Sequence, residues 1–66
     1  MTGPELRRLR KRLGLLQREL ALRVGVTPNT MARWERDEVG ISEPVARLVR
    51  LLAKMELTMK RRRKGR

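Results

Sequence analysis

Gly25 and Pro28 lie three residues apart in "VGVTPNT", and together they restrict the fold of this chain more than any other pair of residues. Glycine readily adopts the left-handed conformation that ends helices, and proline is favoured in the first turn of a helix, where its missing N–H would be unpaired anyway. Thr27, directly before the proline, is a good N-cap. The sequence therefore predicts that one helix ends at Gly25 and that another opens at Pro28 and runs over about 28–36.

Apolar residues at helical spacing predict three further helices. Gly14 is a left-handed stop after the first, and Ser42 is an N-cap before the last. The predicted segments are about 3–13, about two turns within "LQRELALRVG", and about 43–55. Because no segment alternates as a strand does, we expect an all-α fold, a compact bundle of four or five short helices in one domain over 1–57.

The chain has 66 residues, no Cys and no His, so it offers no thiolate, no imidazole and no zinc cluster. We therefore expect no enzyme, no metal and no cofactor.

The formal net charge of +11 is unevenly distributed along the chain. Residues 1–36 contain nine basic and three acidic residues, a net charge of +6, and residues 37–59 contain three basic and four acidic residues, a net charge of −1. Residues 60–66 contain six basic residues and no acidic residue, a net charge of +6. This distribution predicts a polyanionic partner, nucleic acid first and an anionic membrane surface second. With no apolar run typical of a membrane span or signal peptide, we expect a cytoplasmic protein, associated with the nucleoid when bound to DNA.

The segment from Gln17 to Trp34 has the spacing that two helices crossing over a very short turn require. Such a crossing needs a small side chain where the backbones meet and a residue that tolerates positive φ in the turn. Counted from Gln17, Ala21 at the fifth position meets the first need and Gly25 at the ninth meets the second. Apolar residues suited to hold both helices against a third stand at the fourth, eighth, tenth, fifteenth and eighteenth positions: Leu20, Val24, Val26, Met31 and Trp34.

About residues 4–55 resemble the lambda-repressor-like helix-turn-helix family of bacterial and phage regulators, the Cro/C1 or XRE type. The motifs that carry this resemblance are "LRKRLGLLQRELA", "VGVTPNT" and "WER". The resemblance implies a sequence-specific regulator in which the helix over 28–36 enters the major groove of double-stranded DNA and the preceding helix lies across the backbone. It also implies a small repressor, similar to those of phages, to anti-CRISPR-associated autorepressors or to the DNA-binding halves of antitoxins.

The resemblance implies base contacts from the outward positions of the recognition helix, which are Pro28, Asn29, Thr30, Ala32 and Arg33. The chemistry agrees, because Asn pairs bidentately with adenine and Arg with the O6/N7 edge of guanine. Gln17 matches the family residue that contacts a phosphate and supports the recognition helix. The other backbone contacts expected within the domain are Arg18, Thr27 and Arg36.

In the same family an arginine of the first helix pairs with the glutamate that follows the aromatic position of the third, so the resemblance implies a structural ion pair between Arg10 and Glu35. The chain departs from the family pattern at two positions. Leu16 stands where a Ser or Thr usually caps the second helix, and Asp37 replaces a glycine often found after the third. Since Asp tolerates left-handed φ better than most residues, the second change is compatible with the fold.

The last residues, 58–66, form a basic tail that is expected to be disordered alone, because "KRRRKGR" has no apolar residue to bury. Lys60, Arg61 and Arg62 are candidates to follow DNA phosphates or to enter a minor groove. Such a tail also suits RNA, or it acts only as a solubilising end.

The helix predicted over 43–55 carries more apolar surface than three short helices cover easily. Leu48, Leu51, Leu52 and Met55 are therefore candidates for a two-fold interface, as expected for a homodimer on a pseudo-palindromic operator. The alternative is that this helix only closes the core of a monomer.

These patterns favour a dimeric autorepressor that reads double-stranded DNA and takes no small-molecule substrate. The alternative is an RNA-binding or nonspecific nucleic-acid-binding protein that works through its basic tail, with the helix-turn-helix as a scaffold.

Overall fold

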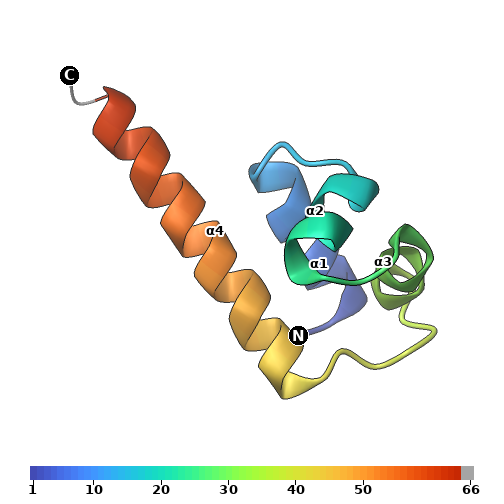
Figure 1. Cartoon of the computed structure of the whole chain (residues 1–66). Coiled ribbons are helices and arrows are strands. Elements are labelled where there is room, and N and C mark those ends of the chain that lie inside the picture. The colour runs from blue at the N-terminus through green and yellow to red at the C-terminus, as the bar shows by residue number, and fades with distance from the viewer. Residues whose placement is uncertain (65–66) are drawn as a thin grey trace.

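The computed structural model describes the backbone of residues 1–64 and the side chains of residues 1–56. The described chain folds into four helices and no strand, which confirms the all-α prediction (Figure 1). The helices are α1 (Gly3–Arg12), α2 (Gln17–Val24), α3 (Pro28–Glu35) and α4 (Glu43–Lys64).

The turn between α2 and α3 forms where the sequence places it. Gly25 ends α2 with φ 90°, and its N–H donates to the carbonyl of Ala21. Thr27 then caps α3, because its Oγ1 accepts a 3.2 Å hydrogen bond from the backbone N–H of Thr30. With Pro28 as the first residue of α3, only three residues separate this helix from α2.

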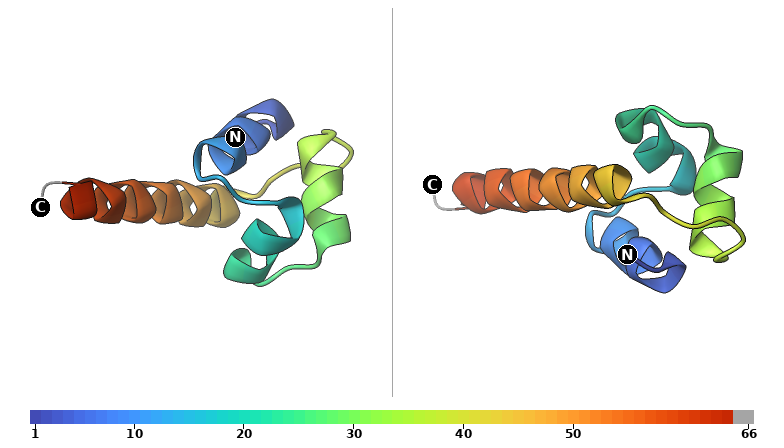
Figure 2. Two further views of the ribbon diagram at one scale, coloured as in Figure 1. Left: turned by 90° about the horizontal axis from the view of Figure 1, so that it is seen from above. Right: turned by 90° about the horizontal axis from the view of Figure 1, so that it is seen from below.

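The core lies where α1, α2, α3 and the first half of α4 meet. Leu6, Leu20, Met31 and Val49, one from each helix, are completely buried. Trp34 is also buried, so the one aromatic residue belongs to the core and is not a platform for stacking bases. α3 packs against α1 and α2, and α4 packs against the same two helices (Figure 2). α3 is therefore held by its inner side on two other helices.

The end of α3 approaches the start of α1 very closely. A Cβ at Gly3 would lie 2.5 Å from the carbonyl oxygens of Trp34 and Glu35, so only glycine fits there. Asp37 follows with φ 59°, and its Oδ1 accepts a 2.7 Å hydrogen bond from the Gly3 N–H. The aspartate at the usual glycine position thus takes up the left-handed turn and also satisfies a free donor at the N-terminus of α1.

α4 is longer than the sequence predicts. It was expected over 43–55, but it continues to Lys64, into the stretch 58–66 that was expected to be a basic tail, so the predicted end of this helix is wrong. The physical reason is that no Gly or Pro interrupts this stretch, most of its residues are good helix formers, and its cations suit a helix C-terminus. α4 consequently extends well beyond the other three helices, and its C-terminal end lies at the opposite end of the molecule from α3 (Figures 1 and 2). None of the helices among the described residues is long and apolar enough to span a bilayer.

Candidate nucleic-acid interface

α3 has one buried and one open side. Met31 and Trp34 face the core, while Pro28, Asn29 and Arg33 are exposed, as expected for base-reading positions. The two other predicted base-contacting residues, Thr30 and Ala32, are partly buried. The Thr30 hydroxyl also lies 3.0 Å from Oγ1 of Thr27, at hydrogen-bond distance, and is therefore less available to a base than the Asn29 amide.

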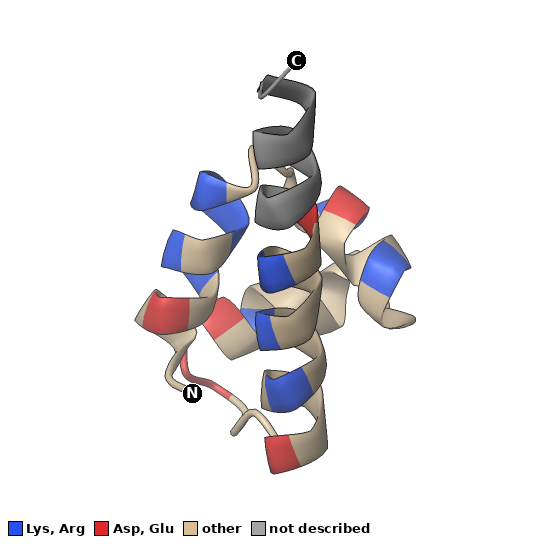
Figure 3. Cartoon of the chain, turned by 90° about the vertical axis from the view of Figure 1, so that its left-hand side faces the viewer, with Lys and Arg blue, Asp and Glu red and all other residues tan. Residues whose placement is uncertain are grey.

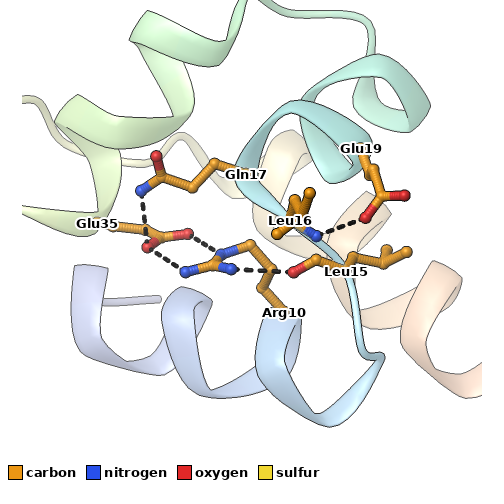
Figure 4. A network of polar contacts seen from close by, with 6 residues as sticks. All are labelled: Arg10, Leu15, Leu16, Gln17, Glu19 and Glu35. Carbon is orange, nitrogen blue, oxygen red and sulfur yellow. Dashed lines mark hydrogen bonds and ion pairs between the residues drawn. The ribbon is translucent and has the colours of Figure 1, made fainter.

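A polar network ties α3 to the two helices that support it (Figure 4). Arg10 of α1 donates to both carboxylate oxygens of Glu35, from Nε at 2.6 Å and from Nη2 at 3.1 Å. Its Nη1 donates to the carbonyl of Leu15 at 2.9 Å, in the loop before α2. The Arg10–Glu35 pair expected as structural is thus present, and it also fixes the entry to α2.

Gln17, the first residue of α2, completes this network. Its Nε2 donates a 3.1 Å hydrogen bond to the same carboxylate of Glu35 (Figure 4). A glutamine amide has two N–H groups, so one remains for a phosphate next to the free backbone N–H groups at the start of α2. This geometry fits both roles that the sequence assigns to Gln17, supporting α3 and contacting the DNA backbone.

The Glu35 side chain is 5% exposed and that of Arg10 is 12% exposed, so the pair is largely removed from water. Burial opposes ionisation of the carboxyl group. The hydrogen bonds from Arg10 and Gln17 and the positive charges of Arg10 and Arg7 outweigh it, and the pKa of Glu35 lies below its ordinary value. The network is therefore ionised at neutral pH.

Beside this network, residues of α1, α2 and α3 border a surface hollow. It is lined by Arg7, Arg10, Gln17, Ala32, Glu35 and Arg36. With Arg10 and Glu35 paired to each other, Arg7 and Arg36 are the cations that this hollow presents to solvent. Arg36 is one of the predicted backbone contacts. Arg7 lies three residues before Arg10 and hence on the same side of α1, but no sequence pattern distinguishes it from the other cations of this helix.

Comparison with known families is consistent with this geometry. Residues 6–55 match the family model described as Helix-turn-helix. The chain belongs to this helix-turn-helix family. The match confirms the predicted Cro/C1-type, XRE-like membership and supports a DNA-binding regulator of this type. No curated protein and no solved structure is similar enough to count as a match.

The remaining predicted backbone contacts within the domain come from α2, from the turn and from the end of α3. Arg18 in the first turn of α2 and Thr27 in the turn are exposed, and Arg36 directly follows α3. Figure 3 shows that Lys and Arg also lie along α1 and the described part of α4, so charge alone does not mark the DNA-binding face. The side chains of Lys60, Arg61 and Arg62 lie outside the described residues.

Glu38 is an acidic neighbour of two arginines, Arg33 in α3 and Arg36 directly after it. It was not among the residues predicted to belong to the interface. Glu38 lies 2.6 Å from Nε of Arg36 and 3.8 Å from Nε of Arg33, measured to its two carboxylate oxygens. A signal was available, because this acid stands in the loop directly after two predicted DNA-contacting arginines. The short distances from Glu38 to the two arginines depend on the left-handed turn at Asp37, which precedes it.

The four apolar residues of α4 selected for an interface differ in exposure. Leu48, Leu51 and Met55 are exposed and share one side of the helix at spacings of three and four residues, whereas Leu52 is partly buried. The core-facing side of α4 is formed by other residues, among them Ala46, Val49 and Ala53. α4 thus has two apolar sides, of which the described chain covers one.

Proposed function

We propose that this helix-turn-helix protein is a sequence-specific transcriptional repressor that binds a pseudo-palindromic operator as a homodimer. The observation that carries the proposal is α3 itself. It exposes Asn29 and Arg33, buries Met31 and Trp34, and is held at its end by the Arg10–Glu35–Gln17 network. An exposed, rigidly supported helix is what docking in a major groove requires.

The side chains of α3 suit base reading. Asn29 offers a donor and an acceptor for the N6/N7 edge of adenine, and Arg33 offers paired donors for the O6/N7 edge of guanine. Phosphate contacts would come from the residues at the edges of α3 and α2, namely Gln17, Arg18, Thr27 and Arg36, and from Arg7 in the same hollow. These contacts would set the position of α3 in the groove while Asn29 and Arg33 select the sequence.

Two copies of the chain would place two recognition helices on one face of DNA. The exposed apolar side of α4, formed by Leu48, Leu51 and Met55, supports an interface between copies. Half-sites would then lie about one helical turn, roughly 34 Å, apart. A dimer seated across a promoter in this way would repress transcription by blocking access to it.

The test begins with selection of binding sites from a random duplex library at physiological salt. Titration then compares the selected operator with scrambled DNA for the wild type, Asn29→Ala and Arg33→Ala. Each variant should lose about tenfold or more in operator affinity and relax the preference at one base position, because a bidentate pair contributes about 1–3 kcal/mol of discrimination.

The matched control is Arg47→Ala, which removes the same charge from an exposed arginine of α4. It should leave the base preference unchanged. Equal binding of the wild type to every duplex, disappearing as salt rises, would contradict the proposal, and tighter binding to RNA than to duplex would replace it with the alternative function.

A further inference from the structure

Glu38 lies between two arginines that the proposed function assigns to DNA. Its Oε2 is 2.6 Å from Nε of Arg36, and its Oε1 is 3.8 Å from Nε of Arg33. All three side chains are about half exposed, so they lie at the surface beside the open side of α3. One carboxylate therefore faces a predicted base contact and a predicted phosphate contact at the same time.

In each ion pair the closest approach of Glu38 is to Nε of the arginine. The 3.8 Å separation from Arg33 is longer than a hydrogen bond, so Glu38 attracts this guanidinium by its charge and favours side-chain conformations that bring it toward the loop. Nη1 and Nη2 form the end of the guanidinium, and these two nitrogens are donors that a bidentate pair with guanine O6 and N7 can use. An approach of Glu38 to Nε can therefore bias the position of Arg33 while the end of the group stays available to read the base.

The same carboxylate has a second effect on binding. DNA bound without sequence recognition is held almost entirely by cations at phosphates. Glu38 offsets part of the positive charge of Arg33 and Arg36 and would lie close to the phosphate backbone, so it weakens this mode of binding. In the operator complex the base contact of Arg33 compensates for that loss.

We infer that Glu38 is a specificity-determining residue of the DNA-binding surface, which positions Arg33 for guanine and disfavours binding to unrelated DNA. The inference rests on the proposed function, because it requires that α3 reads bases. Exposed ion pairs contribute little to folding, so the role should appear in binding and not in stability.

The test is Glu38→Gln, measured against the selected operator and against scrambled DNA over a series of salt concentrations. Scrambled DNA should bind more tightly, with a salt slope steeper by up to about 0.9, the value for one additional phosphate contact. The ratio of operator to scrambled affinity should fall by about tenfold, with the loss concentrated at the guanine that Arg33 reads.

The matched control is Glu43→Gln in the first turn of α4. Glu43 also faces two arginines, at 3.8 Å from Nε of Arg47 and 3.7 Å from Nη1 of Arg50, and its removal changes the net charge equally. Because these residues lie on α4, the control should leave the specificity ratio unchanged. An equal fall in both variants would mean that Glu38 acts only through net charge, and would overturn the inference.

A double-mutant cycle with Arg33→Ala isolates the positioning role. In the Arg33→Ala background, Glu38→Gln should cause no further loss of base preference, since there is no guanidinium left to orient. A full additional loss, or a wild-type specificity ratio in Glu38→Gln alone, would overturn the inference while the proposed function stands. If the wild type selects no operator at all, both fail together.

Discussion

The Glu35 carboxylate accepts hydrogen bonds from two other helices, so its charge state is coupled to the packing of α1, α2 and α3. Its pKa lies below the ordinary value of 4.5, because the donors and positive charges around it outweigh its burial. The unfolded chain then binds this proton more readily than the folded chain. Stability from Glu35 is therefore fully present above about pH 4.5 and is lost as the pH falls through the lower pKa of the folded state.

Glu35→Gln removes the charge and keeps the shape of the side chain. At pH 7 the variant should be less stable than the wild type by about 1–3 kcal/mol, since Arg10 keeps a buried charge without its partner. The difference should shrink as the pH falls below 4.5, where wild-type Glu35 is also becoming neutral. Urea denaturation followed by circular dichroism at pH 7 and near pH 3 measures both values.

Glu43→Gln serves as the control for this experiment, because Glu43 is an exposed carboxylate of α4. It should change the stability little at either pH. A gap between wild type and Glu35→Gln that stays constant from pH 7 to pH 3 would contradict the role assigned to the ionised carboxylate.

At the scale of the element, α2 begins without a side-chain cap. Leu16 has the extended backbone of an N-cap, with φ −78° and ψ 161°, but its side chain accepts no hydrogen bond. Only half of a capping arrangement is present, because the Glu19 carboxylate accepts a 2.7 Å hydrogen bond from the Leu16 N–H. The missing half is a side-chain acceptor for the backbone N–H of Glu19.

Leu16→Ser supplies that acceptor at a position where the leucine is 51% exposed. We expect the free energy of unfolding to rise by about 1 kcal/mol, the typical contribution of a serine N-cap. Leu22→Ser is the control, since it removes an 82% exposed leucine from the interior of the same helix and offers no cap. It should bring no gain. Equal effects of the two substitutions in denaturant titrations would show that the change depends on surface polarity and not on capping.

A helix boundary could be predicted from the sequence where residues within one turn of it determine it. The start of α3 could be predicted because Thr27 and Pro28 act within one turn, and the end of α2 because Gly25 does. The end of α4 could not be predicted in this way. Its apolar pattern weakens after residue 55, but the helix continues because no Gly or Pro interrupts it before its last residue. A search for the next Gly or Pro would have pointed to Gly65.

The candidate interface could likewise be predicted only where a local pattern or the family motif marks a residue. Asn29 and Arg33 follow from their positions in the motif, and Arg10 with Glu35 from the family resemblance. The places of Arg7 and Glu38 could not be predicted, because they depend on the packing of segments far apart in the sequence and on a sharp turn, which no local pattern contains. Arg7 reaches the hollow only because α1 packs beside α3, and Glu38 reaches Arg33 only after the turn at Asp37.

At the scale of the whole molecule, a small domain with a net charge of +11 leaves an apolar strip exposed on α4. Like charges oppose association of two copies, so a dimer must gain its stability from buried apolar surface. Leu51 lies in the middle of the strip, between Leu48 and Met55, and is 53% exposed. It is the position where a substitution should affect a dimer most and the folded monomer least.

Leu51→Glu places a carboxylate in the centre of this strip. The added negative charge reduces the repulsion between copies, so loss of the dimer would have to come from the desolvation of that charge against apolar surface. We expect light scattering to show a dimer for the wild type and a monomer for Leu51→Glu, with operator affinity lowered about tenfold or more and affinity for a single half-site unchanged. Leu22→Glu, the same substitution at an exposed leucine of α2, should remain a dimer. A wild type that stays monomeric at high concentration, with and without operator, would mean that α4 only closes the core and that each copy binds DNA alone.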